Sequence, residues 1–434
     1  MQTDLSKVKK IFFVGIGGIG ISAIARMMLG EGKEVSGSDM SESEILEDLK
    51  KLGADVKLGQ SVLLVPKDTD LVIYSIAIEK YDPEFFKELQ VLGIPMRSYP
   101  EMLGVITESK YTIAVSGTHG KTTTTAMVAK ILVEAKKDPS VIVGSLLKES
   151  SSNFRSGKGE IFVVEACEYE RSFLNIKPKI LVITNIEADH MDYYKDMADL
   201  ESAFSEMSMQ TDSYIVCDPK NPSTANILKK KYKAKVVDYG PYFKEVPKLS
   251  VPGRHNKMNA AAALAVADIL EIDLEIANKS LSEFSGTSRR LERRGEKNGV
   301  IIYDDYAHHP TEIQASLQAL RELYPTGSKK ITVVFQPHLY SRTKVLFGGF
   351  VESFKDADRV LILPVYFARE NLDPSVSSDK LAEAMRKEGD NAEAFRDFKS
   401  AEEAVVKLNL GPNDVLVTMG AGEAFKVANK VFNI

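Results

Sequence analysis

The sequence predicts an α/β protein with mainly parallel sheets, arranged as three domains. Short apolar runs rich in β-branched residues alternate with longer amphipathic runs along all 434 residues, as in strands joined by crossover helices. This alternation starts afresh twice, and the chain is too long for one ordinary core. We therefore expect domains at residues 1–106, 107–286 and 287–434.

The expected elements follow from the period of each run. Strand-like runs of four to eight apolar residues are expected at 10–15, 70–78, 111–117, 160–167, 179–186, 299–306, 330–336, 359–366 and 414–420. Helix-like runs with apolar positions three and four apart are expected at 41–53, 121–135, 256–270 and 310–325. Strands and helices thus alternate in each third of the chain.

Composition excludes several classes of partner. Hydrophobic residues make up 44% and charged residues 27% of the chain, values typical of globular proteins in water. The net charge of −5 provides no general field for nucleic acid or an acidic membrane surface. No uninterrupted apolar run is long enough to span a bilayer. The sequence therefore predicts neither a nucleic-acid nor a membrane partner, and it indicates no particular oligomeric state.

Two further features favour a cytoplasmic location. Lysines precede the apolar run 11–25, as in a signal peptide, but the four glycines in this run disfavour an apolar helix. Cys167 and Cys217 are too few for a disulfide framework. Both lie in apolar strand-like stretches, so we expect buried thiols in a reducing compartment.

The first glycine turn, in "FFVGIGGIGISAIA", predicts a diphosphate site. Gly15, Gly17 and Gly20 follow the pattern G-x-G-x-x-G between a strand and a helix, where the backbone can approach a pyrophosphate at a helix N-terminus. Asp39 ends the next strand, where it could contact a ribose hydroxyl. The pattern alone does not select the nucleotide: NAD, another nucleotide and a simple tight turn remain open.

The second glycine turn, "AVSGTHGKTTTT", predicts a phosphate-binding loop of a short kind. The common pattern GxxxxGK[ST] requires a glycine where this chain has Val115. Gly117, Gly120, Lys121 and Thr122 nevertheless keep the order strand, glycine loop, lysine, hydroxyl. The lysine can reach the β- and γ-phosphates, and the hydroxyl can bind Mg²⁺.

Histidines and carboxylates in short polar patches suggest further site walls. The six histidines are His119, His190, His255, His308, His309 and His338. Their spacing matches no zinc motif, so carboxylates are the better metal candidates. Glu165 lies near the end of a predicted strand, where it could join Thr122 on Mg²⁺, and His190 could complete a second cation site.

Nine patches, taken together and in order, resemble the Mur ligases of peptidoglycan synthesis. They are "FVGIGGIGISAIA", "GTHGKTTTT", "VVEACEYERSFL", "TNIEADHMDYY", "PGRHNKMNAAAA", "SRRLE", "DDYAHHPTE", "FQPHLYSRT" and "MGAGE". The resemblance covers nearly the whole chain and is strongest to members that join L-alanine to the carboxylate of UDP-N-acetylmuramate through an acyl phosphate. It implies an N-terminal Rossmann-like UDP domain, a central P-loop ATPase domain and a C-terminal Rossmann-like domain. ATP and Mg²⁺ are the implied cofactors.

The resemblance also assigns roles by motif. The UDP-sugar is expected on Gly15, Gly17, Gly18, Gly20, Asp39 and Ser75. ATP is expected on Gly117, Thr118, His119, Gly120, Lys121, Thr122, Thr123, Asn256, Asn259, Arg290 and Asp305. In this set the two asparagines are on the adenine side, Arg290 is at the γ-phosphate and Asp305 is at the ribose. Metal ligands are Thr122, Glu165 and His190; substrate-side residues are His308, His309 and Arg342; catalytic residues are Lys121, Glu165, His190 and Arg290.

Two positions depart from the family pattern. "FQPH" is often followed by arginine in the family, but Leu339 stands there in this chain, so recognition on that side is expected to rest more on Arg342. The segment 218–252 is short, whereas relatives usually place extra strands there.

Four other functions remain to be weighed against this one. They are a ligase that attaches a preformed peptide to UDP-N-acetylmuramate, a folate-type polyglutamyl ligase, an NAD-dependent oxidoreductase with an accessory ATPase domain, and a non-catalytic nucleotide switch. The oxidoreductase would leave "DDYAHHPTE" and "FQPHLYSRT" without a role, and the UDP-like first domain argues against a folate ligase.

Overall fold

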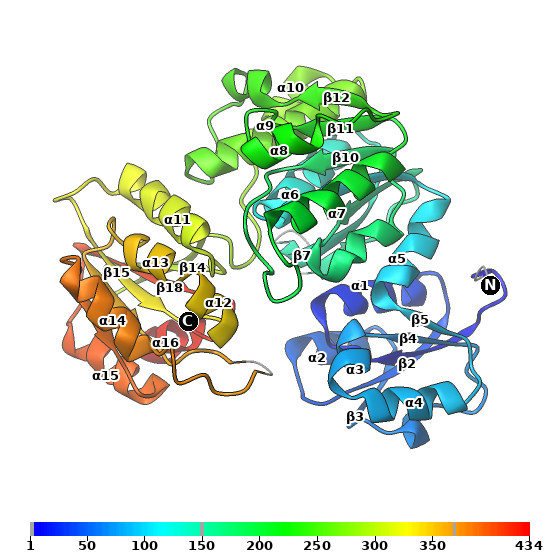
Figure 1. The fold of residues 1–434 in the computed structure, drawn as a ribbon, viewed down its shortest axis with the longest axis horizontal. Coiled ribbons are helices and arrows are strands. Elements are labelled where there is room, and N and C mark those ends of the chain that lie inside the picture. Colours follow the sequence, from blue (N-terminus) through cyan, green and yellow to red (C-terminus); the bar gives the residue numbers. More distant parts are fainter. Residues whose placement is uncertain (1–3, 148–151, 368–369) are drawn as a thin grey trace. The chain divides into compact units, whose positions relative to one another are not determined.

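The computed structural model describes residues 4–147, 152–367 and 370–434, and three sheets follow one another along the chain (Figure 1). The chain forms two compact units. The first comprises 1–187, 197–247 and 260–281, and the second comprises 188–196, 248–259 and 282–434. Two short segments from the middle of the sequence thus belong to the unit that contains the C-terminal sheet.

The first sheet has five parallel strands in the order β3-β2-β1-β4-β5. Its elements are β1 (Lys10–Val14), α1 (Ile19–Gly30), β2 (Glu34–Asp39), α2 (Glu44–Lys51), β3 (Asp55–Leu58), the 3-10 helix η1 (Val62–Leu64), β4 (Leu71–Tyr74), α3 (Ile76–Tyr81), α4 (Pro83–Val91), β5 (Met96–Ser98) and α5 (Tyr99–Glu108). The chain order reverses between β1 and β4, and the carboxyl ends of strands at such a switch point are where open α/β sheets bind ligands. The strand expected at 70–78 is half wrong, because β4 ends at Tyr74 and a helix begins at Ile76.

The second sheet has seven strands in the order β12-β11-β10-β6-β9-β7-β8, parallel except for the β7–β8 pair. Its elements are β6 (Tyr111–Ser116), α6 (Lys121–Glu134), β7 (Ser140–Leu147), β8 (Ser152–Arg155), β9 (Ile161–Glu165), η2 (Tyr169–Asn175), β10 (Ile180–Ile183), α7 (Met197–Gln210), β11 (Tyr214–Cys217), α8 (Pro222–Ile227), β12 (Lys235–Asp238), η3 (Gly240–Lys244), α9 (Arg254–Ile269) and α10 (Leu274–Ser282). The short segment 218–252 contributes the single strand β12.

The third sheet has six strands in the order β13-β14-β18-β15-β16-β17, parallel except for β13–β14. Its elements are β13 (Glu292–Lys297), β14 (Val300–Asp305), α11 (Pro310–Leu323), β15 (Lys330–Phe335), α12 (Tyr340–Val345), α13 (Phe347–Glu352), β16 (Arg359–Ile362), α14 (Ser378–Lys387), β17 (Ala392–Ala394), α15 (Phe398–Lys407), β18 (Asp414–Met419) and α16 (Phe425–Phe432).

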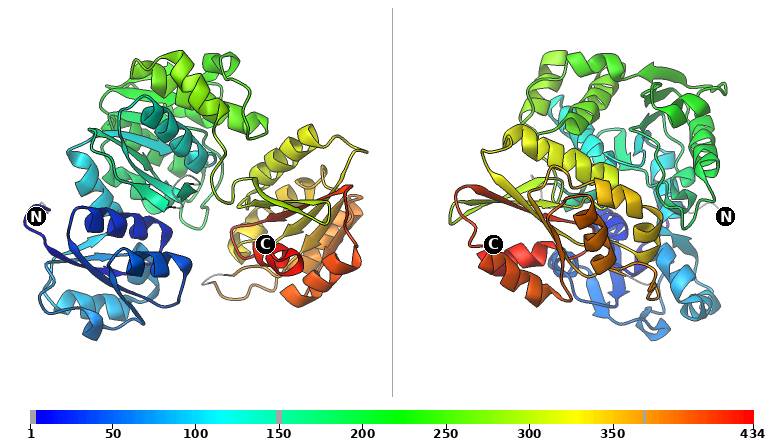
Figure 2. Two further views of the ribbon diagram at one scale, coloured as in Figure 1. Left: turned by 180° about the vertical axis from the view of Figure 1, so that it is seen from behind. Right: turned by 60° about the vertical axis from the view of Figure 1, so that its left-hand side comes forward.

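Helices cover both faces of this third sheet (Figure 2). One face packs Val333 against Ile313 of α11, and the other packs Leu416 against Val427 of α16. Burial on both faces explains why its strands read as continuous apolar runs in the sequence. Within the described ranges, no helix combines the length and the apolar character that a bilayer crossing requires.

Candidate active site

The predicted phosphate loop, residues 117–120, lies between the central strand β6 and helix α6. Gly117 has φ +129° and Gly120 has φ +80°, values in the left-handed region that favours glycine. A Cβ on Gly117 would lie 2.1 Å from Oγ1 of Thr184. The segment that follows β10 also holds the loop, because the backbone N–H of His119 donates to Oδ1 of Asn185 at 3.0 Å. The predicted order of strand, glycine loop and helix is therefore present.

Lys121 begins α6 and is held by an acidic partner that the sequence interpretation missed. Its Nζ donates to the carbonyl oxygens of Gly117 at 2.6 Å and Thr118 at 3.0 Å. It also lies 3.0 Å from both carboxylate oxygens of Glu168, whose side chain is 1% exposed. Burial is the largest single influence and by itself lowers the pKa of Lys121, but Glu168, Cys167 and Glu165 together outweigh it and raise that pKa, so the lysine stays cationic.

Thr122 and Glu165 form an oxygen-rich corner beside this lysine. Oγ1 of Thr122 donates to Oε1 of Glu165 at 3.1 Å, and the backbone N–H of Gly144 donates to Oε2 of Glu165 at 2.7 Å. A Cβ on Gly144 would come within 2.7 Å of the same carboxylate. A hydroxyl and a carboxylate are ligands that suit Mg²⁺, so the residues present fit this ion. His190 belongs to the second unit, and its role as a ligand stays a prediction.

The two cysteines differ in exposure. Cys217 is buried at the end of β11, as expected, but Cys167 is exposed. The expectation was wrong for Cys167 because the chain leaves the sheet after Glu165, the last residue of β9.

The first glycine turn has the geometry of a backbone cradle. Gly15 has φ +75°, and the backbone N–H of Gly17 donates to Oδ2 of Asp39 at 2.9 Å. A Cβ on Gly20 would lie 2.6 Å from the ring of Tyr99. Asp39 thus braces the turn itself, and its contact with a sugar stays a prediction. Two further predicted residues lie at this turn. Gly18 immediately precedes α1. Ser75 immediately precedes α3, and its backbone N–H donates to the carbonyl oxygen of Val14 at 3.1 Å.

In the second unit, the residues expected near the adenosine are well buried. Nδ2 of Asn256 donates to the carbonyl of Pro252 at 2.7 Å, and Nδ2 of Asn259 lies 3.5 Å from Oδ1 of Asn256. Asp305 accepts bonds from the N–H of Ala307 at 3.1 Å and from the hydroxyl of Ser316. Burial raises the pKa of Asp305 to about 6. The ribose contact expected of Asp305 stays a prediction.

Glu312 of α11 brings two predicted site residues together. Its Oε1 lies 3.8 Å from Nη1 of Arg290, and its Oε2 lies 3.4 Å from Nδ1 of His308. His309 has a more structural position, because its Nδ1 accepts the backbone N–H of Thr311 at 3.3 Å at the start of α11. The motif "DDYAHHPTE" thus combines a site wall with a helix cap.

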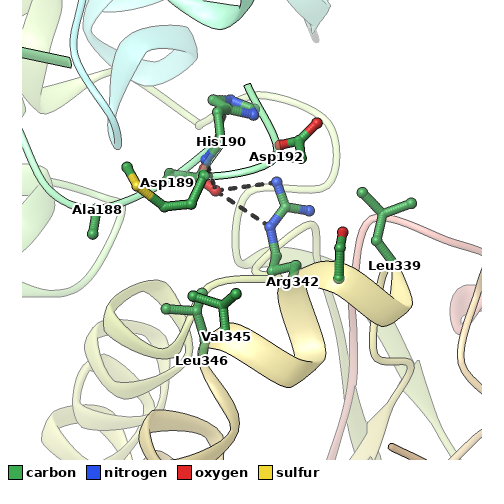
Figure 3. A pocket seen from close by; sticks show the side chains of 10 residues that line it. Ala188, Asp189, His190, Asp192, Leu339, Arg342, Val345 and Leu346 are labelled. Atoms are coloured by element: carbon green, nitrogen blue, oxygen red, sulfur yellow. Dashed lines mark hydrogen bonds and ion pairs between the residues drawn. The ribbon is translucent and has the colours of Figure 1, made fainter. Parts of the chain in front are cut away.

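Arg342 lies in a pocket of the second unit, and its partner Asp189 is also a residue that the sequence interpretation did not assign (Figure 3). One wall of the pocket consists of residues 188–192, and the other is formed by side chains of α12 and its flanks. Nε and Nη2 of Arg342 both donate to Oδ1 of Asp189, at 3.3 and 3.2 Å. Nη1 of Arg342 contacts Nδ1 of His338 at 3.0 Å.

Burial sets the charge of the groups around this arginine. Burial lowers the pKa of His308 to about 4 and the pKa of His338 to about 3, so both rings are neutral at pH 7. Burial alone would raise the pKa of Asp189, but the charges of His190 and Arg342 lower it overall. Arg342 and Asp189, whose side chains are 9% and 8% exposed, therefore form an ion pair beside the neutral rings of His308 and His338.

Three family models match successive parts of the chain. The model described as "Mur ligase family, catalytic domain" matches residues 10–111, the "Mur ligase middle domain" matches 115–245, and the "Mur ligase, glutamate ligase domain" matches 289–422. The first and third matches contain the first and third sheets, and the second match contains the second sheet apart from most of β6.

Relatives resemble the chain over its whole length. It is 40% identical over 462 aligned residues to a UDP-N-acetylmuramate–L-alanine ligase of Clostridium kluyveri, with 100% of both chains covered. The crystal structure of a UDP-N-acetylmuramate–alanine ligase of Thermotoga maritima is 30% identical, with a TM-score of 0.81 and 98% of both chains covered. A murein peptide ligase of Psychrobacter arcticus shares the fold at 22% identity, with a TM-score of 0.71 and 98% of both chains covered.

Proposed function

The chain belongs to the Mur ligase family, and from this premise we propose that it joins L-alanine to the carboxylate of UDP-N-acetylmuramate at the expense of ATP. The enzyme is an amide-forming ligase of peptidoglycan precursor synthesis with the three-domain architecture of its family. The observation that carries the proposal is the phosphate loop, in which the cationic Lys121 lies beside the Thr122–Glu165 oxygen pair.

The reaction needs ATP because a free carboxylate has no good leaving group. A carboxylate oxygen attacks the γ-phosphorus, ADP leaves, and an acyl phosphate forms. The amine of L-alanine then attacks the acyl carbon, phosphate leaves with the bonding electrons, and the nitrogen loses a proton. Negative charge develops on the transferring phosphoryl group and then on the tetrahedral oxygen, so fixed cations stabilise both steps.

Each predicted residue has a place in this scheme. Lys121 binds the β- and γ-phosphates, and Arg290 is assigned to the γ-phosphate. Thr122 and Glu165 are assigned as ligands of Mg²⁺, which would neutralise phosphate charge when bound, and His190 is assigned as a ligand of a second cation. The cradle at Gly15, Gly17, Gly18 and Gly20 is assigned to the diphosphate of the UDP-sugar, with Asp39 and Ser75 beside it.

The remaining assignments concern the second unit and the whole chain. Asn256, Asn259 and Asp305 are assigned to the adenosine, and His308, His309 and Arg342 to the substrate side. We assign UDP-sugar binding to residues 1–106, ATP binding to 107–286 and closing of the site to 287–434. We place the reaction in the cytoplasm, as the glycine-interrupted N-terminal run and the two cysteines predict.

Phosphate release with Mg²⁺-ATP tests the proposal. We expect release only when UDP-N-acetylmuramate and L-alanine are both present. Release without either substrate would indicate a stand-alone NTPase or a switch. Release with a peptide such as L-alanyl-γ-D-glutamyl-diaminopimelate, but not with L-alanine, would move the assignment to the peptide-attaching class.

A further inference from the structure

The guanidinium of Arg342 is well suited to bind a carboxylate, and in this structure the side chain of Asp189 occupies it. A guanidinium fork favours two parallel hydrogen bonds to the two oxygens of one carboxylate. In this structure both donors, Nε and Nη2, converge on the single oxygen Oδ1 of Asp189. The ideal partner of this fork would use both of its oxygens.

The contact is also long and shared. Its distances of 3.3 and 3.2 Å exceed the roughly 2.7–2.9 Å that is usual for charge-assisted bonds. The same Oδ1 accepts the backbone N–H of His190 at 2.8 Å. Asp189 therefore holds the arginine less firmly than a free carboxylate could.

Burial explains why the arginine has an internal partner at all. The side chains of Arg342 and Asp189 are 9% and 8% exposed, and a buried cation without a counter-charge is strongly unfavourable. Replacing one carboxylate by another keeps a counter-charge on Arg342, so an exchange avoids that penalty for the arginine, and the displaced Asp189 keeps Nε2 of His190 3.7 Å from its Oδ2. The pocket beside the fork has apolar walls at Leu339, Val345 and Leu346, which suit a small aliphatic side chain.

We propose that Asp189 is an internal placeholder for the amino-acid substrate: its carboxylate occupies Arg342 in the free enzyme and is displaced by the free carboxylate of L-alanine. This inference rests on the proposed function. The apparent affinity for L-alanine then equals the intrinsic affinity multiplied by the fraction of enzyme in which the guanidinium of Arg342 is free of Asp189. Asp189 is thus a residue that sets specificity and affinity through Arg342.

The test compares Asp189→Asn with Asp189→Glu. Phosphate release is measured at saturating Mg²⁺-ATP and UDP-N-acetylmuramate while L-alanine is varied. Asp189→Asn removes the competing charge, so we expect the KM for L-alanine to fall about threefold to tenfold, with the KM for ATP, measured in a separate series with ATP varied, unchanged. Asp189→Glu keeps a carboxylate and should leave the KM for L-alanine at the wild-type value or above it.

A matched control is available in the same pocket. Asp192 also lines it, so Asp192→Asn removes the same charge from the same wall and should not lower the KM for L-alanine. L-alaninamide has the same amine but no carboxylate, so Asp189→Asn should not lower the KM for L-alaninamide.

Each of the following results would overturn the placeholder. A higher KM for L-alanine in Asp189→Asn would mean that the carboxylate holds the substrate ammonium instead. An unchanged KM with a lower kcat, or loss of folding in both variants by circular dichroism, would mean a structural role. If the wild-type enzyme releases no phosphate in response to L-alanine, the proposed function is refuted, and the placeholder with it. If the wild-type enzyme is active but Asp189→Asn leaves the KM for L-alanine unchanged, only the placeholder is refuted.

Discussion

Two buried cations of this protein, Lys121 and Arg342, each lie against an internal carboxylate, but the two pairs are built differently. Lys121 is 3.0 Å from both oxygens of Glu168 and also bonds two loop carbonyls. Arg342 shares one oxygen of Asp189 through two longer bonds. The first arrangement is a fixed part of the phosphate loop, and the second suits exchange with a ligand.

This difference separates what each pair contributes. Removing the carboxylate from the fixed pair is expected to cost stability, because the lysine then stays buried without its counter-charge. Removing it from the exchangeable pair also leaves a cation without its partner, but it is expected in addition to change the affinity for the amino acid. The following predictions test the two sides of this comparison.

The largest expected effect is on catalysis at the phosphate loop. Lys121→Ala should lower kcat about 10²-fold or more, because a fixed cation is lost where phosphoryl charge develops. Steady-state phosphate release measures it. Lys130→Ala, on the same helix, is the control and should stay within about twofold of wild type. A similar loss in both variants would contradict a specific role for Lys121.

Glu168→Gln should lower the free energy of unfolding by roughly 3 kcal/mol, because it breaks a buried ion pair and leaves Lys121 charged. Denaturant titration measures this. Glu170→Gln is the control, since Glu170 pairs at 2.8 Å with the 43%-exposed Lys80, and loss of an exposed pair costs less than about 1 kcal/mol. Equal losses in the two variants would show that the Lys121 pair is not a fixed one.

Acid should weaken the second unit through its neutral histidines. Burial lowers the pKa of His255 to about 4, against an opposing effect of Glu312. The unfolded chain therefore gains a proton near its ordinary pKa of 6.5, while the folded chain does not until about 4. The stability from this group is complete above pH 6.5 and is lost as the pH falls toward 4.

The size of this effect is on the order of 2 kcal/mol by pH 5. Unfolding midpoints of wild type and His255→Gln, measured at pH 7 and pH 5, check it. The variant should lose less stability on acidification. An identical loss in both proteins would assign the acid sensitivity to other groups.

The smallest expected effect concerns the position next to His338. Leu339 stands where the family often has arginine, and it lines the Arg342 pocket. Leu339→Arg should add a second cation for the amino-acid carboxylate and lower the KM for L-alanine about threefold. Val345→Arg adds the same charge to the same pocket as a control. Equal changes in the two variants would mean that general charge, and not position, governs affinity.

The sequence predicted the local parts of this site well and the long-range pairs poorly. The loop at Gly117, Gly120 and Lys121 is contiguous, so its glycine and lysine spacing determines most of its geometry. The strand predicted at 70–78 was too long, because the pattern of a short apolar run is the same for one strand and for a strand followed by a helix. Tyr74 ends the strand, and α3 starts two residues later.

The internal carboxylates were missed for a different reason. Glu168 meets Lys121 across 47 residues, and Asp189 meets Arg342 across 153, so neither pair has a fixed sequence spacing. A signal was nevertheless present for Glu168, which lies in the same motif as Glu165. A buried lysine needs a counter-charge, and the acidic residues of the motif "VVEACEYERSFL" are candidates to supply it to Lys121.

Transfer of oxygen-18 tests the central claim most directly, namely that the γ-phosphoryl group passes to the UDP-N-acetylmuramate carboxylate before the amide forms. The substrate is labelled with oxygen-18 in its carboxylate, and the phosphate released with L-alanine is examined by mass spectrometry. The acyl phosphate route predicts one labelled oxygen in each phosphate, because the bridging oxygen leaves with phosphorus. Unlabelled phosphate formed together with the amide product would contradict it.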